Sequence, residues 1–198
     1  MSGHEIAGIL TGLIILVAEW TQIVDMLKRK AKPSRSSYWV WTAVQGITAA
    51  SYYATGGGFA VALPVSSAVM FLVIAILSIR YGEGRWGRLD TACIIGSIAS
   101  LVLWAASGSA FLALLFLIIT DWFGGVTTIR KSIPRPYNEP QLNWALTFLA
   151  TMTNLFAVGG WTPSDILYNA HMIVLAGTIT LLVCRVWFVK VKKDNSGL

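Results

Sequence analysis

Residues 5–35 of the chain read EIAGILTGLIILVAEWTQIVDMLKRKAKPSR, a long apolar run with Glu19 in its interior, followed by a basic cluster around a proline. The apolar part, residues 5–27, has the roughly 20 residues that an α-helix needs to cross a bilayer. Basic residues gather where a helix leaves the membrane. The stretch therefore predicts a membrane-spanning helix that ends in a basic turn.

The composition of the whole chain agrees with this prediction. Of the 198 residues, 56% are hydrophobic and only 12% are charged, whereas soluble domains carry roughly 25% charged residues. So much apolar surface cannot be buried in one water-solvated core of this size, so lipid is the expected solvent. An ordinary soluble enzyme, a disordered chain and a disulfide scaffold are excluded as classes.

Six further apolar segments follow the first, joined by short connections rich in Gly, Pro and Ser. Continuous apolar runs indicate helices rather than the alternating strands of a membrane barrel. We expect an all-α membrane protein in which residues 1–198 form a single transmembrane domain that ends in a cytoplasmic tail, residues 189–198. The seven predicted spans are residues 5–27, 36–55, 60–79, 89–106, 109–129, 141–159 and 165–188.

The positions of the 15 Lys and Arg residues predict the orientation of the chain. They form four groups, 28–35, 80–88, 130–135 and 185–193, which follow the first, third, fifth and seventh spans. With seven spans all four groups lie on one side of the membrane, which the positive-inside rule makes the cytoplasmic side. We therefore expect the N-terminus outside and the C-terminus inside. The net charge of +6 is then explained by topology and not by binding of nucleic acid.

The first three spans match the last three at an offset of 102–103 residues. Glu19 corresponds to Asp121, and Trp41 corresponds to Trp144. Because one helix separates the two copies, both have the same orientation in the membrane, a plan found in secondary carriers with the substrate near the midplane. The predicted parts are a first three-helix repeat at 5–80, a linker helix at 88–107 and a second three-helix repeat at 109–188.

Residues 20–41, WTQIVDMLKRKAKPSRSSYWVW, resemble the signature of the PQ-loop carriers. That signature is a Pro-Gln pair late in the first helix, a basic turn, small polar residues and a Trp-rich second helix. Here Thr21 replaces the proline beside Gln22, and Phe123 or Gly124 replaces it in the second copy. With its 3+1+3 plan, the chain resembles the SWEET and PQ-loop carrier superfamily over essentially its whole length. The resemblance implies a carrier fold with a site between the repeats.

Glu19 and Asp121 are ionisable residues inside predicted spans, and such residues are functional candidates by default. Each precedes a basic residue, Lys28 or Arg130, by nine positions, which places it roughly 13 Å from the cytoplasmic boundary. If the repeat holds, the two acids face one central cavity and serve proton or ion coupling. The alternative is that each carboxyl only ties helices together by hydrogen bonds.

The resemblance also implies binding residues on the second and third helices of each half. At an offset of 103, Ser66 corresponds to Asn169, which holds the place of the family's site asparagine, and Ser51 corresponds to Asn154. These side chains could hydrogen-bond a sugar or a nucleoside. The alternative is interhelical hydrogen bonding, worth only about 0.6 kcal/mol on average.

Six more residues inside or near the spans need an assignment. His171 and Gln45 could hydrogen-bond a solute, and Trp20 and Trp122 could stack on a ring-shaped ligand, although helix packing would explain each of them as well. The remaining tryptophans, among them Trp41 and Trp144, are assigned to the aromatic belts at the membrane interfaces.

The sequence favours a carrier over an enzyme. It has no metal-ligand pattern, no nucleophile constellation and no phosphate-binding loop, so we expect no catalysis, no cofactor and no metal. We expect a transporter or facilitator for a small polar solute, such as a sugar, nucleoside or vitamin-like compound, in a bacterial-type cytoplasmic membrane. Its expected partners are the solute and the lipid bilayer, with self-association left open. The alternative is a non-transporting receptor, sorting or scaffold protein of the same fold.

Overall fold

The computed structural model describes residues 2–54, 62–83, 88–158 and 163–195, which form eight helices and no strand. The all-α prediction is confirmed, and each of the seven predicted segments is a helix. A short 3₁₀ helix before the sixth segment was not predicted. The helices are α1 (Gly3–Leu27), α2 (Arg35–Ala54), α3 (Ala62–Tyr81), α4 (Arg88–Ser107), α5 (Ala110–Ser132), η2 (Pro136–Asn138), α6 (Gln141–Asn154) and α7 (Pro163–Asn195).

Two of the predicted boundaries are wrong. α6 ends at Asn154 instead of near residue 159, because the chain tightens into three-residue turns, the first closed by Leu155 N–H donating to the carbonyl of Met152. α6 is therefore only about 21 Å long. α7 continues to Asn195 and takes in most of the predicted tail, since residues 189–195 contain no Gly or Pro that would end it.

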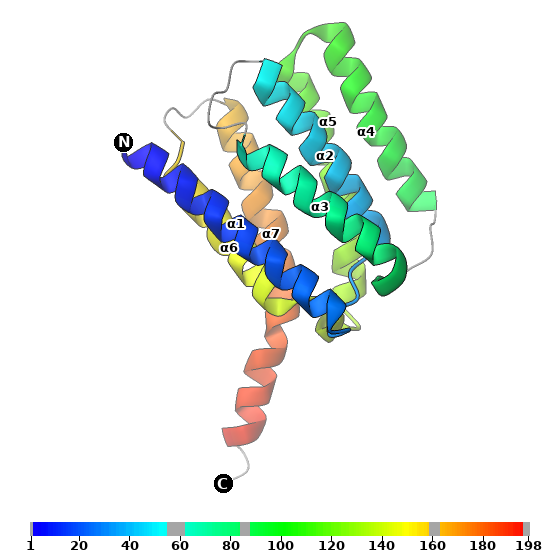
Figure 1. Cartoon of the computed structure of the whole chain (residues 1–198), viewed down its shortest axis with the longest axis vertical. Coiled ribbons are helices and arrows are strands. Elements are labelled where there is room, and N and C mark those ends of the chain that lie inside the picture. Colours follow the sequence, from blue (N-terminus) through cyan, green and yellow to red (C-terminus); the bar gives the residue numbers. More distant parts are fainter. Residues whose placement is uncertain (1, 55–61, 84–87, 159–162, 196–198) are drawn as a thin grey trace.

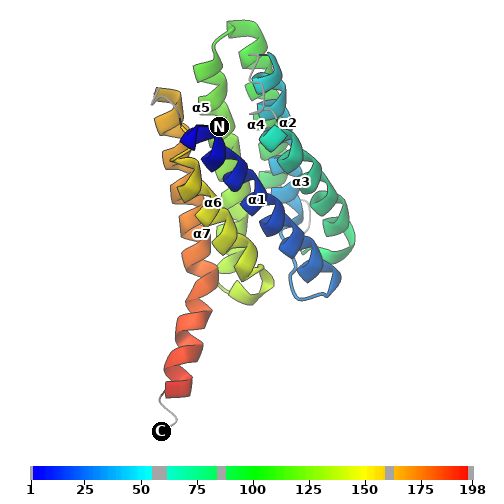
Figure 2. The same ribbon diagram turned by 60° about the vertical axis from the view of Figure 1, so that its left-hand side comes forward.

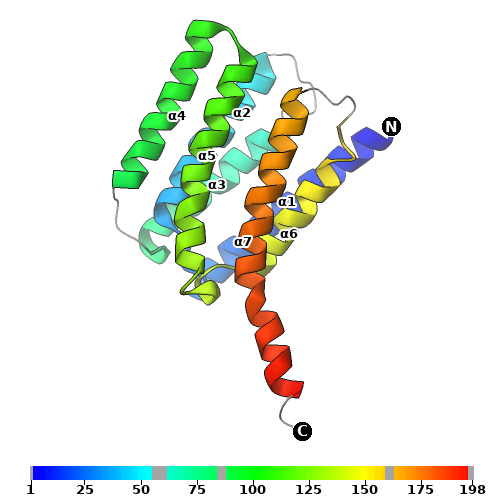
Figure 3. The same cartoon turned by 180° about the vertical axis from the view of Figure 1, so that it is seen from behind.

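The seven long helices run up and down in one bundle (Figure 1). α1 packs on α3 and α6, and its counterpart α5 packs on α7 and α2. α2 lies along α3 just as α6 lies along α7. Each contact within or between the first half (α1–α3) and the second half (α5–α7) therefore has an equivalent. α4 lies at the outer edge against α5 and α2, as Figure 3 shows from behind.

Polar contacts tie the two halves together. The Ser37 hydroxyl at the start of α2 donates to the carbonyl of Gly124 on α5 at 2.8 Å and bonds the Thr128 hydroxyl at 3.0 Å. In the other half of the bundle, the Asn143 amide at the start of α6 donates to the carbonyl of Ala18 on α1 at 2.7 Å. In both cases the start of one helix is bonded to the later part of an antiparallel neighbour.

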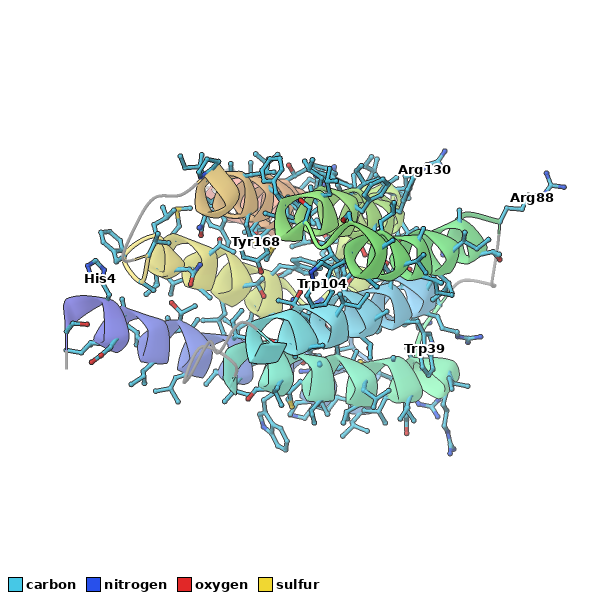
Figure 4. All side chains as sticks on the ribbon, turned by 90° about the horizontal axis from the view of Figure 1, so that it is seen from above. His4, Trp39, Arg88, Trp104, Arg130 and Tyr168 are labelled. Atoms are coloured by element: carbon cyan, nitrogen blue, oxygen red, sulfur yellow. The ribbon has the colours of Figure 1, made fainter. Side chains whose placement is uncertain are left out.

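The described residues of all four basic groups lie at one end of the bundle, which we call the basic end. His4 lies at the opposite end from Arg88 and Arg130 (Figure 4), and α7 continues beyond the other helices at the basic end (Figure 2). The expected segregation of charge is thus present in the fold. Side chains of the basic groups bond backbone carbonyls across this end: Arg35 to Ser78 and Ile79, Lys131 to Lys32, and Arg185 to Ile133.

Many apolar side chains lie on the outside of the bundle, and several polar side chains lie inside it. On α1 the outward residues Ile6, Leu13 and Val17 are each more than half exposed, whereas Glu19 and Gln22 are buried. Exposed aliphatic side chains also cover α3, α4 and α7. Monomeric soluble proteins rarely expose continuous apolar surfaces of this extent.

Two of the described helices are long and apolar enough to cross a membrane, Gly3–Leu27 with 25 residues and Ile166–Arg185 with 20. A third apolar stretch, Val65–Tyr81, is shorter. The buried core that positions the interior groups lies between α1, α2, α3, α6 and α7. The largest of its side chains that are fully buried are Met26, Ile74 and Ile179.

Candidate functional site

Both acids predicted from the sequence line one cavity between the two halves of the bundle. Glu19 enters it from α1 and Asp121 from the equivalent helix, α5. Gln45 on α2, with Asn143 and Thr147 on α6, completes the polar part of the lining. The cavity has a volume of about 60 Å³, which is room for a few water molecules.

Four aromatic side chains form the wall of the cavity: Tyr38, Trp41, Phe71 and Trp144. Trp41 meets Trp144 edge to face, with 5.7 Å between ring centroids, and Tyr38 meets Trp41 in the same way at 5.1 Å. Trp41 and Trp144 are equivalent residues of the two halves, and equivalent residues that touch lie at the centre of the pairing. The aromatic wall therefore lies between the halves.

The assignment of Trp41 and Trp144 to an interfacial belt was wrong. Both are only 6% exposed, because they pack inside the bundle. Trp41 contacts Phe71 on α3, and Trp144 contacts Trp41. A position near a helix start therefore does not imply contact with the membrane surface.

Glu19 is buried, with 3% of its surface exposed, and its Oε2 atom has no hydrogen-bond partner. One turn further along α1, Gln22 is fully buried and neither atom of its amide is paired. Leaving a buried polar group unpaired costs about 1–3 kcal/mol. Such groups in a folded protein indicate a place where a proton, water or ligand binds. Glu19 is the one that faces the cavity.

Asp121, by contrast, has a partner. Its Oδ2 atom lies 2.7 Å from Nε2 of His171 on α7, and both residues are buried. The ring of Trp122 lies 6.0 Å from the His171 ring and that of Tyr168 lies 6.5 Å away. The sequence identified Asp121, Trp122 and His171 as separate candidates, and the structure brings them together behind the cavity.

The other polar candidates lie away from the cavity. The Asn154 amide donates to Oδ1 of Asn169 at 2.9 Å, which joins the end of α6 to α7. Ser66 is half-buried on α3, and neither it nor the two asparagines line the cavity. Ser51 belongs to α2, but its side chain lies outside the described residues.

Trp20 does not reach the site. It is 62% exposed on the outer face of α1, because one residue along a helix turns the side chain by about 100°. The inward face of α1 is occupied by Ala18, Glu19 and Gln22. Of the residues proposed for binding, Gln45 is the one that lines the cavity.

Three polar lining residues were missed: Tyr38, Asn143 and Thr147. Asn143 and Thr147 lie four residues apart on α6, and the Thr147 hydroxyl donates to the Asn143 carbonyl at 2.9 Å. The repeat could not have identified Asn143, since the matching position in the first half is Val40. The signal available in the sequence was a polar face on an otherwise apolar helix.

A buried carboxylate lies between the aromatic wall and the basic end. Glu139 is 2% exposed, lies 2.7 Å from Nζ of Lys131 and accepts a hydrogen bond from Trp144 Nε1 at 3.4 Å. Burial raises the pKa of Glu139, and the nearby Lys131 ammonium opposes that rise. Glu83, which ends the first half, accepts from Asn138 at 2.9 Å and lies 3.8 Å from Lys131. These contacts join the halves at the basic end.

Metal binding finds no support within the described part of the chain, where no group of three or more His, Cys, Asp or Glu could hold an ion. Comparison of the chain with protein-family models, with curated proteins and with solved structures found no match. The function therefore has to be inferred from the cavity, its lining and the surface around it.

Proposed function

We propose that this chain is a seven-helix membrane carrier of the SWEET and PQ-loop type that moves a small polar solute through the cavity between its halves. The proposal rests on one main observation: Glu19 and Asp121, which come from equivalent helices, both line that cavity. A membrane carrier with parallel repeats holds its substrate near the midplane, at the interface of the repeats.

The apolar outer surface supports the membrane part of the proposal. Lipid is the solvent in which exposed residues such as Ile76, Ile98 and Leu181 cost nothing. The basic end would lie in the cytoplasm, with the N-terminus outside. A fluorescent protein fused to the C-terminus should then be fluorescent, and alkaline phosphatase fused there should be inactive. The reverse pair of results would overturn this orientation.

The size of the cavity supports a moving carrier and argues against a fixed channel. Its volume of about 60 Å³ is well below the roughly 300–1,000 Å³ of a site for a drug-sized ligand. Solute entry therefore requires the halves to separate. At the basic end this separation would break the contacts of Lys131 with Glu139 and Glu83.

Glu19 supports a proton-linked cycle. Its Oε2 atom has no hydrogen-bond partner, so a proton can be taken up or released there without breaking a hydrogen bond of that atom. Asp121 lacks that freedom, because a change of its charge would alter the contact with His171.

Uptake into liposomes tests the proposal. Purified protein is reconstituted and offered labelled sugars, nucleosides, vitamins and amino acids, with and without a pH gradient. We expect saturable uptake of one class, and we expect Glu19→Gln to lower it about ten- to hundredfold, the loss of one or two contacts to a charged group. Trp20→Phe, on the outer face, is the matched control and should transport normally.

One outcome would oppose the carrier, and another would oppose the role of Glu19 in it. A solute that binds the purified protein but is never taken up would favour the receptor of the same fold. Normal uptake by Glu19→Gln would show that transport does not depend on the Glu19 carboxyl in the cavity.

A further inference from the structure

We propose that the solute is a small organic cation, an ammonium compound held between the aromatic wall and the Glu19 carboxyl. This inference rests on the proposed function and specifies its substrate class. Three features of the cavity support it: the charge of its lining, the chemistry of the groups left unpaired, and the arrangement of the aromatic rings.

The charge of the lining is negative or neutral and never positive. Glu19 and Asp121 are its ionisable acids, and no Lys, Arg or His is among the described residues that line it. Asp121 already has His171 beside it. Glu19 has no such partner, and a buried lone carboxylate needs a proton or a cation to balance it. A neutral sugar or nucleoside would leave that charge unbalanced.

One oxygen of the lining has no hydrogen-bond partner. Oε2 of Glu19 stays free to accept. The Asn143 amide donates to the Ala18 carbonyl at 2.7 Å, and the Thr147 hydroxyl donates to the Asn143 carbonyl at 2.9 Å. An ammonium group brings donors or polarised methyl groups, which are what such an acceptor binds.

The aromatic wall completes the environment of a cation. Tyr38, Trp41, Phe71 and Trp144 come from three helices, and neighbouring ring centroids lie 5.1–6.1 Å apart. A cation over an aromatic face gains electrostatic attraction from the ring, and the gain is larger when the site is shielded from water. The rings that would supply this gain lie at the interface of the halves, where a solute would be enclosed.

The test compares pairs of probes that differ in charge and little in shape. Choline is paired with 3,3-dimethylbutan-1-ol, in which carbon replaces the ammonium nitrogen, and ethanolammonium is paired with ethylene glycol. Thermal unfolding of the full chain in detergent is followed against the concentration of each. We expect both cations to raise Tm in a saturable way, since a ligand bound only by the folded state stabilises it. We expect no saturable shift with either neutral partner.

Variants of two cavity residues test whether the cations bind in the cavity. Glu19→Gln should weaken the apparent Kd for choline at least about tenfold, which corresponds to 1.4 kcal/mol. Trp41→Leu should also weaken it, whereas Trp41→Phe, which keeps a ring, should retain most of the binding. The two Trp41 variants keep the test decisive if Glu19→Gln fails to fold.

Two results would overturn the inference. The first is an equal shift from choline and its neutral isostere, because shape alone would then explain binding. The second is the absence of any shift with both cations. Saturable uptake of a sugar or nucleoside by liposomes in that second case would leave the carrier proposal standing and remove only the cation, so the two failures are distinguishable.

Discussion

The two halves of the bundle carry an acid at the same place, but they treat it differently. In the second half, Asp121 is held by His171 at 2.7 Å. In the first half, Glu19 is buried to the same degree and its Oε2 atom has no partner. Glu19 and Asp121 occupy equivalent positions, but only Asp121 has a histidine beside it. One acid is therefore built into the fold, and the other is available to a proton or a solute.

The residues that follow the two acids also differ between the halves. Gly124 and Gly125 stand where the first half has Gln22 and Ile23. A Cβ on Gly125 would clash with the Leu175 side chain, so the glycine lets α5 and α7 approach closely. Gln22 instead buries an amide without partners. Of the five buried side-chain atoms without a partner among the described residues, four belong to the first half and one, Nδ1 of His171, to the second.

The largest expected effect is a difference in protein stability between a variant at the partner of Asp121 and a variant at Glu19. His171→Ala leaves Asp121 buried without a partner and should lower the free energy of unfolding by about 3–5 kcal/mol. Glu19→Gln replaces a carboxyl whose Oε2 atom has no partner, and should change the free energy of unfolding by less than about 1 kcal/mol. Denaturant unfolding of both variants in the same detergent measures the difference.

A double variant checks the cause of that loss. Asp121→Asn combined with His171→Ala removes the buried charge along with its partner, so it should be more stable than His171→Ala alone. If Glu19→Gln proved as unstable as His171→Ala, Glu19 would be a structural residue like Asp121, and the comparison between the halves would fail.

The next effect tests the close packing of the second half. Gly125→Ala forces Leu175 out of its place, and overpacking of this kind costs about 1–3 kcal/mol. Gly46→Ala is the matched control, because nothing lies within 4 Å of its added Cβ and alanine favours a helix by up to about 1 kcal/mol. Thermal unfolding compares the two variants, and an equal Tm for both would show that α5 and α7 have room to adjust.

The sequence predicts the helices of this fold well and the site only in part. Apolar runs bounded by Gly, Pro and basic residues give seven helices, and the spacing of Lys and Arg gives the common end on which they lie. The offset between Glu19 and Asp121 predicts two acids on equivalent helices. All of these are local or periodic signals, which a single sequence contains.

The remaining features depend on which helices touch. That His171 pairs with Asp121, while Asn154 pairs with Asn169, follows from the contacts of α7 with α5 and α6. The outward direction of Trp20 depends on the rotation of α1 in the bundle, which the sequence beside Glu19 does not fix. Tertiary contacts of this kind have no short-range signature.

A smaller effect concerns the basic end, where the two halves also differ. Glu139 is buried beside Trp144, and the matching position in the first half is Ser36. Burial raises the pKa of Glu139 above its ordinary value, so at mildly acidic pH the folded state binds more protons than the unfolded state. Stability should then fall as pH rises from about 4.3, the ordinary pKa of Glu, through the raised pKa.

Glu139→Gln should flatten this part of the stability profile, by about 1.4 kcal/mol for each unit by which the pKa was raised. Tm measured at steps from acidic to neutral pH gives the profile. Lys131 and Glu83, which both act on Glu139, stay in place, and Glu5→Gln at the opposite end controls for the loss of one acid. A profile identical to that of the unaltered chain would show that the Glu139–Lys131 pair keeps its charge throughout.

The smallest effect is expected for the exposed charge at the same end. The Arg135 side chain is 68% exposed and lies 3.8 Å from Glu83, and exposed pairs contribute about 0–1 kcal/mol. Arg135→Ala should therefore leave Tm nearly unchanged. Lys131→Ala, which deprives the buried Glu139 of its partner, should lower it clearly. Equal losses of Tm would mean that the number of charges at the basic end determines its stability. A larger loss for Lys131→Ala would mean that the buried Glu139 determines it.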